Sequence, residues 1–265
     1  MPPRKPATLR VVNVPPVTSK YCHRATLILD CAYTSASALL LAFHLVRERR
    51  GRPRGMTTDE EQDLLRAMLV MAAAGLDSMV KQLIRDSLPA LVAMHPDVRD
   101  GLEKFIAKQV RGEGESSAVP SGKDFLARIL AAQSHQAQVV EEYINELTKG
   151  SLQSPSELYR IAAALGLPKQ VLGVNHEPLK IIFDIRNQIV HELDINLEAE
   201  RRIRNVRRSG DMISHTDALV RVAENIRDAV EKKLAAAITP LPVSKPAPSR
   251  GAKPPGGKTR KAAGR

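Results

Sequence analysis

The sequence contains no tryptophan, and Phe, Trp and Tyr together make up 3% of its 265 residues. Leu, Ala, Val and Ile supply most of its apolar side chains instead. Aromatic residues favour strands, whereas Leu and Ala favour helices. No stretch in which apolar and polar residues alternate is long enough to form a strand. The composition therefore predicts an all-α protein that packs through aliphatic side chains.

Cysteine is also scarce, because only Cys22 and Cys31 occur. Two residues do not make a disulfide framework, and no CxxC pair is present. His23 and His44 lie near them in the sequence, but no fourth ligand has the spacing of a zinc site. We expect two reduced thiols in a cytoplasmic protein, with no metal and no other cofactor.

Acidic residues are missing from both ends of the chain. Residues 1–20 carry four cations and residues 240–265 carry seven, which together account for the whole net charge of +11. The C-terminal stretch is rich in Pro, Gly, Ala and Lys and has little apolar surface to bury. We predict a flexible basic arm at 1–20, an all-α domain at 21–239 and a disordered basic tail at 240–265. The tails suit a polyanion such as nucleic acid, and solvated linkers are the alternative.

Apolar residues at helical spacing mark the helices of the middle part. Thr58 with Glu61 three residues later predicts a capping box at the start of one of them. Pro89 should end that helix, and Gly150 and Gly166 should end two others. The predicted helical segments are 25–46, 58–88, 97–110, 123–150, 154–167, 177–195 and 215–238.

Residues 25–46 have the length of a membrane-spanning helix and precede a basic stretch. Asp30, His44 and several hydroxyl side chains interrupt this segment, which a spanning helix tolerates poorly. A helix that is apolar nearly all round also suits the centre of a bundle or a dimer interface. We therefore expect no membrane association, and the N-terminus has no secretion signal.

One helix carries an unusual polar set, Arg186-Asn187-x-x-x-His191, within an otherwise apolar stretch. Asn187 and His191 are four residues apart and share one helix face, and Arg186 lies about 140° round the axis from His191. The set should border the stripe that packs into the core, which comprises Ile182, Ile185, Ile189 and Leu193. An arginine that pairs with a carboxylate beside a half-buried histidine is the structural alternative.

The stretch IRNQIVHEL resembles the HEPN superfamily of ribonucleases and toxins, whose mark is Arg, a polar residue, three variable positions and His on a late helix. The segment RAMLVMAAAGLDSMVKQLIRDSL also resembles an early helix of the RiboL-PSP type of HEPN domain. Asp77 would be its acidic residue, where Glu is more usual. The likeness spans about residues 60–235 and implies a HEPN-like helical bundle.

The resemblance implies metal-independent cleavage of RNA by these four residues. His191 would take the proton from a ribose 2′-hydroxyl, and the oxygen would attack phosphorus to leave a 2′,3′-cyclic phosphate. Arg186 would hold the phosphate. Asn187 would orient substrate or His191, and Asp77 would position Arg186 or fix the imidazole tautomer. A homodimer with a composite active site is implied, in which the second His191 protonates the leaving oxygen.

A run of arginines follows the motif and suits a phosphate-binding rim, although a solvated helix is the alternative. With few aromatics, RNA would be held by its backbone, and tRNA, rRNA and mRNA all stay open as targets. The resemblance implies a role in a toxin–antitoxin, stress or antiviral defence system, with an antitoxin as a second partner. The predicted RNA-binding residues are Arg201, Arg202, Arg204, Arg207 and Arg208.

Two other functions are also compatible with the sequence. The chain could be an inactive HEPN scaffold that binds a partner, although such a scaffold has no need of the intact trio. The segment SPSELYRIAAALGLPKQVLG also resembles the start of a helix-turn-helix, which would make the protein a DNA-binding regulator. Its second helix has few side chains that could contact bases in a major groove.

Overall fold

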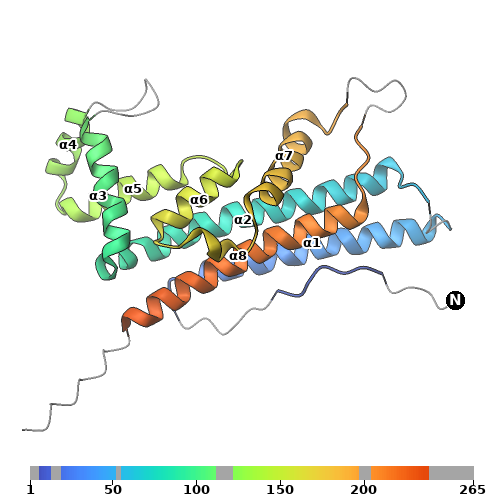
Figure 1. The fold of residues 1–265 in the computed structure, drawn as a ribbon, viewed down its shortest axis with the longest axis horizontal. Helices are drawn as coiled ribbons and strands as arrows, with labels where there is room; N and C mark the ends of the chain where they lie inside the picture. The colour runs from blue at the N-terminus through green and yellow to red at the C-terminus, as the bar shows by residue number, and fades with distance from the viewer. Residues whose placement is uncertain (1–5, 13–18, 52–54, 112–121, 197–203, 239–265) are drawn as a thin grey trace, which may run out of the picture.

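A computed structural model describes residues 6–12, 19–51, 55–111, 122–196 and 204–238 (Figure 1). These residues form an all-α protein, as the composition predicts; their one β-bridge, between Ile195 and Arg204, belongs to no strand. The helices are α1 His23–Arg49, α2 Asp59–Met94, α3 Pro96–Arg111, α4 Gly122–Ala131, α5 His135–Thr148, α6 Pro155–Ala164, the 3₁₀ turn η1 Lys169–Leu172, α7 His176–Glu192 and α8 Ser209–Ile238.

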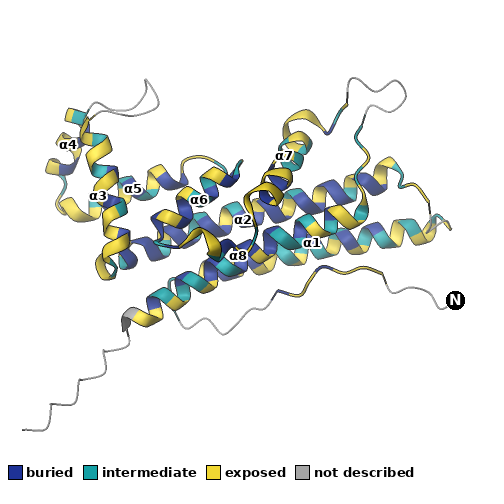
Figure 2. Ribbon diagram, in the orientation of Figure 1, coloured by how far each residue is buried: buried dark blue, intermediate teal, exposed yellow. Residues whose placement is uncertain are grey.

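The long helix α2 is the centre of the molecule and contacts α1, α3, α5, α7 and α8 (Figure 1). Its inward residues, such as Leu65, Leu76 and Leu83, are at most 1% exposed, and Figure 2 shows the buried stripe along its length. Gly75 permits a close approach to α1, since a Cβ at this position would lie 2.2 Å from the Cβ of Ala32. Aliphatic burial of this kind is the main stabilising contribution to such a bundle.

Two predicted helix boundaries are confirmed. Thr58 and Glu61 form the capping box of α2, with Glu61 N donating to Thr58 Oγ1 at 3.3 Å and Thr58 N donating to Glu61 Oε2 at 3.1 Å. Gly166, with a φ of +66°, follows the end of α6. That backbone conformation favours glycine and interrupts the helix.

The prediction that Pro89 ends its helix is wrong, because α2 continues to Met94. Proline removes one backbone hydrogen bond and crowds the preceding turn, which disfavours it inside a helix. Leu88, Leu91 and Val92, on both sides of the proline, are at most 2% exposed. Burial of these apolar side chains offsets the lost hydrogen bond, so the helix persists.

The predicted single helix over 123–150 is two helices, α4 and α5. Ser134 interrupts it, because its hydroxyl accepts from Ala137 N at the start of α5. Serine competes for backbone hydrogen bonds in this way and so favours caps. The last helix, predicted from residue 215, begins earlier, at Ser209.

Part of the predicted flexible arm is packed against the bundle. Leu9 and Val12 are 4% and 7% exposed, and Arg10 N donates to Asp217 Oδ1 of α8 at 2.9 Å. A flexible arm is therefore the wrong description of residues 6–12. Residues 1–5 and 13–18 of the arm, and the whole predicted tail at 240–265, lie outside the described residues.

Candidate functional site

The motif helix α7 lies across α2 and is held there by Leu179, Ile182 and Phe183, each at most 2% exposed. Ile185 and Ile189 are partly buried against the same core. The first three members of the predicted stripe therefore face inward. Leu193 does not, because it is 65% exposed.

The end of α7 explains this exception. The helix ends at Glu192, and the next two residues, Leu193 and Asp194, have φ values of 52° and 58°. Two left-handed residues in a row break the helical period, so position 193 turns outward and Asp194 becomes fully buried. The predicted helix to residue 195 is thus three residues too long.

Arg186 and Asn187 hydrogen-bond to each other on the partly exposed side of α7. Arg186 Nη1 donates to Asn187 Oδ1 at 2.9 Å, and Asn187 Nδ2 donates to the carbonyl of Gln153 at 3.0 Å. The loop before α6 therefore fixes the amide, and the amide orients one arm of the guanidinium. Arg186 Nε is shielded from solvent and has no hydrogen-bond partner among the described residues.

Asp77 lies beside this loop. Its Oδ1 accepts from Leu152 N at 2.9 Å, and its Oδ2 accepts from Lys81 Nζ at 2.7 Å. The contacts link Asp77 to the motif through Leu152 and Gln153 rather than through Arg186 or His191. The sequence analysis did not predict the ion pair with Lys81, although the four-residue spacing from Asp77 favours it. It also did not predict the contact with the Leu152–Gln153 loop, because no sequence pattern marks that contact.

His191 occupies the last turn of α7 and its side chain is exposed. It follows Asn187 by one helical turn, so the imidazole and the Asn187–Arg186 pair open on neighbouring parts of one surface. An exposed imidazole nitrogen is open to a substrate and can serve as a proton acceptor. The motif thus combines a proton acceptor, a partly buried cation and an amide fixed by the backbone.

The predicted arginine rim has a different environment from the one expected. Arg204 pairs with Asp63 at 2.7 Å, while Arg207 pairs with Asp194 and donates to Gln188 Oε1 at 2.7 Å. Residues 204–208 are not helical, so the expected helical rim is not formed there. Arg208 is exposed, and Arg201 and Arg202 lie outside the described residues.

Asp194 is the centre of a buried polar network at the end of α7. Arg66, which is 3% exposed, donates from Nε to Asp194 Oδ2 at 2.8 Å and from Nη2 to the carbonyl of Asn205 at 2.6 Å. Burial alone would raise the pKa of Asp194, but hydrogen bonds from Arg207, Arg66 and Asn205 outweigh it and hold the pKa below its usual value. This network ties the connection between α7 and α8 to α2.

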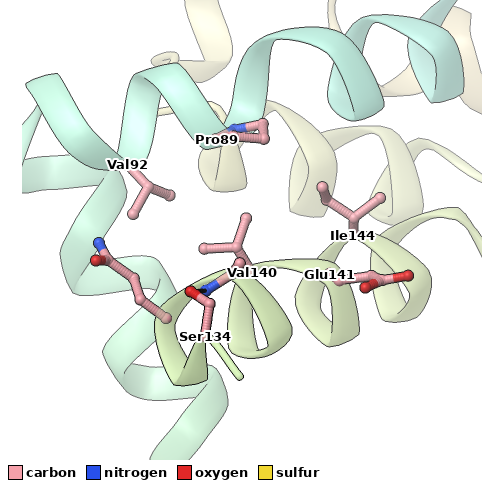
Figure 3. Close-up of a pocket in the computed structure, with 8 residues that line it drawn as sticks. Pro89, Val92, Ser134, Val140, Glu141 and Ile144 are labelled. Atoms are coloured by element: carbon pink, nitrogen blue, oxygen red, sulfur yellow. Dashed lines mark hydrogen bonds between the residues drawn. The ribbon is translucent and has the colours of Figure 1, made fainter. Parts of the chain in front are cut away.

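A separate hollow lies between α2 and α5, lined by Pro89, Val92, Val140 and Ile144 with Ser134 and Glu141 at its edge (Figure 3). Its lining is mostly apolar and contains none of the motif residues.

In the part of the chain that the structure describes, no group of three or more His, Cys, Asp or Glu side chains is placed to hold a metal ion.

The segment that resembles a helix-turn-helix is α6 followed by the four-residue turn η1. Leu172 of this turn is buried, and its carbonyl accepts from Asn225 of α8. A recognition helix is not formed at this position.

α1 and α2 are long and apolar enough to cross a membrane, a test that the core helix of a soluble protein also meets.

Comparison with known proteins adds no identity: no protein-family model, no curated protein and no solved structure matches this chain.

Proposed function

We propose that the protein is a metal-independent endoribonuclease of HEPN type, with Arg186, Asn187 and His191 as its catalytic residues. The observation that carries the proposal is one surface of α7, where an exposed imidazole follows a guanidinium that is oriented by an amide. Cleavage by 2′-hydroxyl attack needs a proton acceptor beside a fixed cation, and this surface supplies both.

The reaction would follow from these positions. His191 removes the proton from a ribose 2′-hydroxyl, and the oxygen forms a bond to the adjacent phosphorus. The bond from phosphorus to the 5′-oxygen breaks, which leaves a 2′,3′-cyclic phosphate on one fragment and a 5′-hydroxyl on the other. Arg186 offsets the charge that grows on the phosphoryl oxygens.

Arg186 Nε, which has no hydrogen-bond partner among the described residues, supports a role in holding a phosphate. A shielded donor without an acceptor costs about 1–3 kcal/mol, and a ligand oxygen that accepts from it would remove that cost. Because Asn187 already holds Nη1, less side-chain freedom is lost when the fork meets a phosphate. Asp77 is proposed as a positioning residue that acts through the Leu152–Gln153 loop.

The leaving 5′-oxygen needs a proton donor, and we propose the His191 of a second copy. Exposed apolar residues on the motif helix suit such a contact, because Ile181 and Val190 on α7 are 51% and 40% exposed. From the same resemblance we propose a cytoplasmic role in defence, in stress or in a toxin–antitoxin system. The target would be tRNA, rRNA or mRNA, and an antitoxin would be a second partner.

An inactive scaffold is the second candidate. It is favoured by the ion pairs of Arg204 and Arg207, which neutralise part of the rim that was expected to bind RNA. The orientation of Arg186 by Asn187 argues for catalysis, since a scaffold has no use for a fixed guanidinium.

Cleavage of RNA in EDTA tests the proposal. The purified protein should cut a mixed-sequence RNA with excess EDTA present, and the fragments should carry 2′,3′-cyclic phosphate and 5′-hydroxyl ends. DNA of the same sequence should stay intact, because deoxyribose has no 2′-hydroxyl. Activity that requires added magnesium, or that cuts the DNA equally well, would contradict the mechanism.

A further inference from the structure

Another hollow, of about 360 Å³, lies where α3, α5 and α6 meet, and we call it the α3–α5–α6 hollow (Figure 1). Small residues make room for it, because Gly101 on α3 and Ala163 and Ala164 on α6 are part of its lining. Asp97 also lines it, but its carboxylate is already paired with Lys233. Sites for small molecules have volumes of about 300–1,000 Å³, so the hollow has the size of such a site.

The hydroxyl of Tyr143 on α5 is directed into this hollow. The residue is 7% exposed, and its ring packs against Phe105 at a centroid distance of 5.0 Å. Its Oη lies beside Gly101, where an added Cβ would be 3.3 Å from it. The hydroxyl has no hydrogen-bond partner among the described residues. Because a shielded hydroxyl without a partner is unfavourable, its position indicates a polar occupant.

The protonation state of Tyr143 suits a contact with a charged ligand. Burial raises the pKa of Tyr143, and this effect outweighs the opposite effect of the nearby Arg160 guanidinium. The hydroxyl therefore keeps its proton at neutral pH. It can donate one hydrogen bond to an anionic oxygen and accept another from a cationic group.

Charged side chains of both signs lie at the rim of the hollow. Asp100 and Lys104 are one helical turn apart on α3, yet no ion pair joins them, and neither has another partner among the described residues. Arg160 on α6 makes a long contact of 3.8 Å with Glu146, in which the two side chains are 50% and 44% exposed. An exposed pair of this kind is weak. The rim thus presents one carboxylate and two cations to a ligand.

An occupant that carries both charges matches this rim best. A ligand with only a negative charge would face Asp100, and a ligand with only a positive charge would face Lys104 and Arg160. A small zwitterion satisfies both, with its carboxylate toward the two cations and its ammonium group toward Asp100. Free α-amino acids have this arrangement, and the small residues of the lining leave room for a side chain.

We propose that the α3–α5–α6 hollow is a binding site for a free α-amino acid, which is held by Tyr143, Lys104, Arg160 and Asp100. No motif residue lines the hollow. The proposal therefore goes beyond the ribonuclease activity and does not depend on it.

Calorimetric titration of the full chain with each of the common L-amino acids, without RNA, tests the site. At least one amino acid should bind with a millimolar or lower dissociation constant. The amine and the acid that correspond to it, each lacking one of its two charges, should bind at least about tenfold more weakly, because a charged group of the rim is then left without a partner. Absence of binding by every amino acid, or equal affinity for the amine or the acid, would overturn the proposal.

Substitution of Tyr143 tests its hydroxyl. Tyr143→Phe removes this group alone and should weaken binding of the amino acid about tenfold, as expected for a lost hydrogen bond to a charged group. Tyr159→Phe is the matched control, because Tyr159 is also on α6 or α5 surroundings of the bundle but does not line the hollow, and it should bind as the wild type does. Wild-type affinity in Tyr143→Phe would contradict the proposed site.

Substitution of Lys104 tests the charge of the rim. Lys104→Gln should weaken binding about tenfold, whereas Lys108→Gln, one turn further along α3 and outside the hollow, should leave it unchanged. Both residues are exposed, so the melting temperatures of the free proteins should stay the same. Equal affinities of the two variants would show that Lys104 does not hold the ligand and would overturn the assignment.

Discussion

Arginines occupy two polar sites, one at the end of α7 and one within this helix, and the two sites have opposite environments. In the first, Arg66 and Arg207 contact the fully buried carboxylate of Asp194. In the second, Arg186 contacts only the neutral amide of Asn187 among its described polar partners, and the exposed His191 follows one turn later. The carboxylate of Asp194 offsets the charge of the first site, whereas Arg186 in the second site has no carboxylate partner among the described residues.

The difference shows that the number of arginines in a stretch does not predict where a phosphate would bind. The run after the motif has the higher density of cations, yet Arg204 and Arg207 are committed to Asp63 and Asp194. A guanidinium that is already paired with a carboxylate offers little to an anion. We therefore assign a structural role to this junction, and the chemical role of the motif remains our proposal.

The largest effect is expected from Asp194→Asn, which removes the carboxylate at the centre of the junction. Arg66 is 3% exposed and would be left as a buried cation without its strongest partner. Loss of one partner of a buried pair typically costs about 3–5 kcal/mol. Urea unfolding should show this decrease in the free energy of unfolding.

Asp63→Asn is the matched control, because Asp63 also pairs with Arg66 but its side chain is 51% exposed. An exposed pair contributes about 1 kcal/mol or less, so this variant should stay close to the wild type. Equal losses in the two variants would show that burial of Asp194 does not decide the effect.

Acid should also distinguish the wild type from Asp194→Asn. The pKa of Asp194 lies below its usual value, so its stabilising contribution is present above about pH 4 and is lost as the pH falls toward the lower pKa of the folded state. Below pH 4 the wild type should lose stability more steeply than Asp194→Asn. Parallel curves would contradict the assignment.

A smaller effect is expected from Asp77→Ala, which frees the loop that fixes Asn187. Loss of the acceptor for Leu152 N should displace Gln153 and so misplace the Asn187–Arg186 pair. Misplacement of about 1 Å can reduce a rate by up to about a hundredfold, and we expect RNA cleavage to fall about tenfold or more.

Asp77→Asn distinguishes positioning from a direct role in catalysis. The amide oxygen can still accept from Leu152 N, so this variant should recover most of the cleavage rate, although it loses the ion pair with Lys81. If the Asn and Ala variants are equally impaired while both stay folded, the charge of Asp77 matters and the loop account is wrong.

Local patterns were enough to predict most helices and the inward side of α7. The capping box at Thr58 and the apolar residues Ile182, Ile185 and Ile189 depend on neighbours in the sequence, and these predictions agree with the structure. Pro89 was misjudged because a local penalty is offset by tertiary burial, which a window of sequence does not contain.

The surroundings of the motif could not be predicted from the sequence. Asn187 contacts Gln153, which is 34 residues away, and Asp77 contacts Leu152, which is 75 residues away. Both contacts use backbone atoms, which every residue possesses, so no residue type marks them. Asp194 was missed for a related reason: its burial depends on two left-handed residues at the end of α7.

The cleavage rate of His191→Ala tests the central claim most directly. We predict that this variant, in EDTA, cuts RNA at least about a hundredfold more slowly than the wild type, because its proton acceptor is gone. Its melting temperature should not change, since His191 is exposed. His135→Ala, which removes a histidine whose ring contacts the Ile129 carbonyl, should cut at the wild-type rate. A His191→Ala protein that cleaves RNA as fast as the wild type would contradict the assignment of α7 as the catalytic helix.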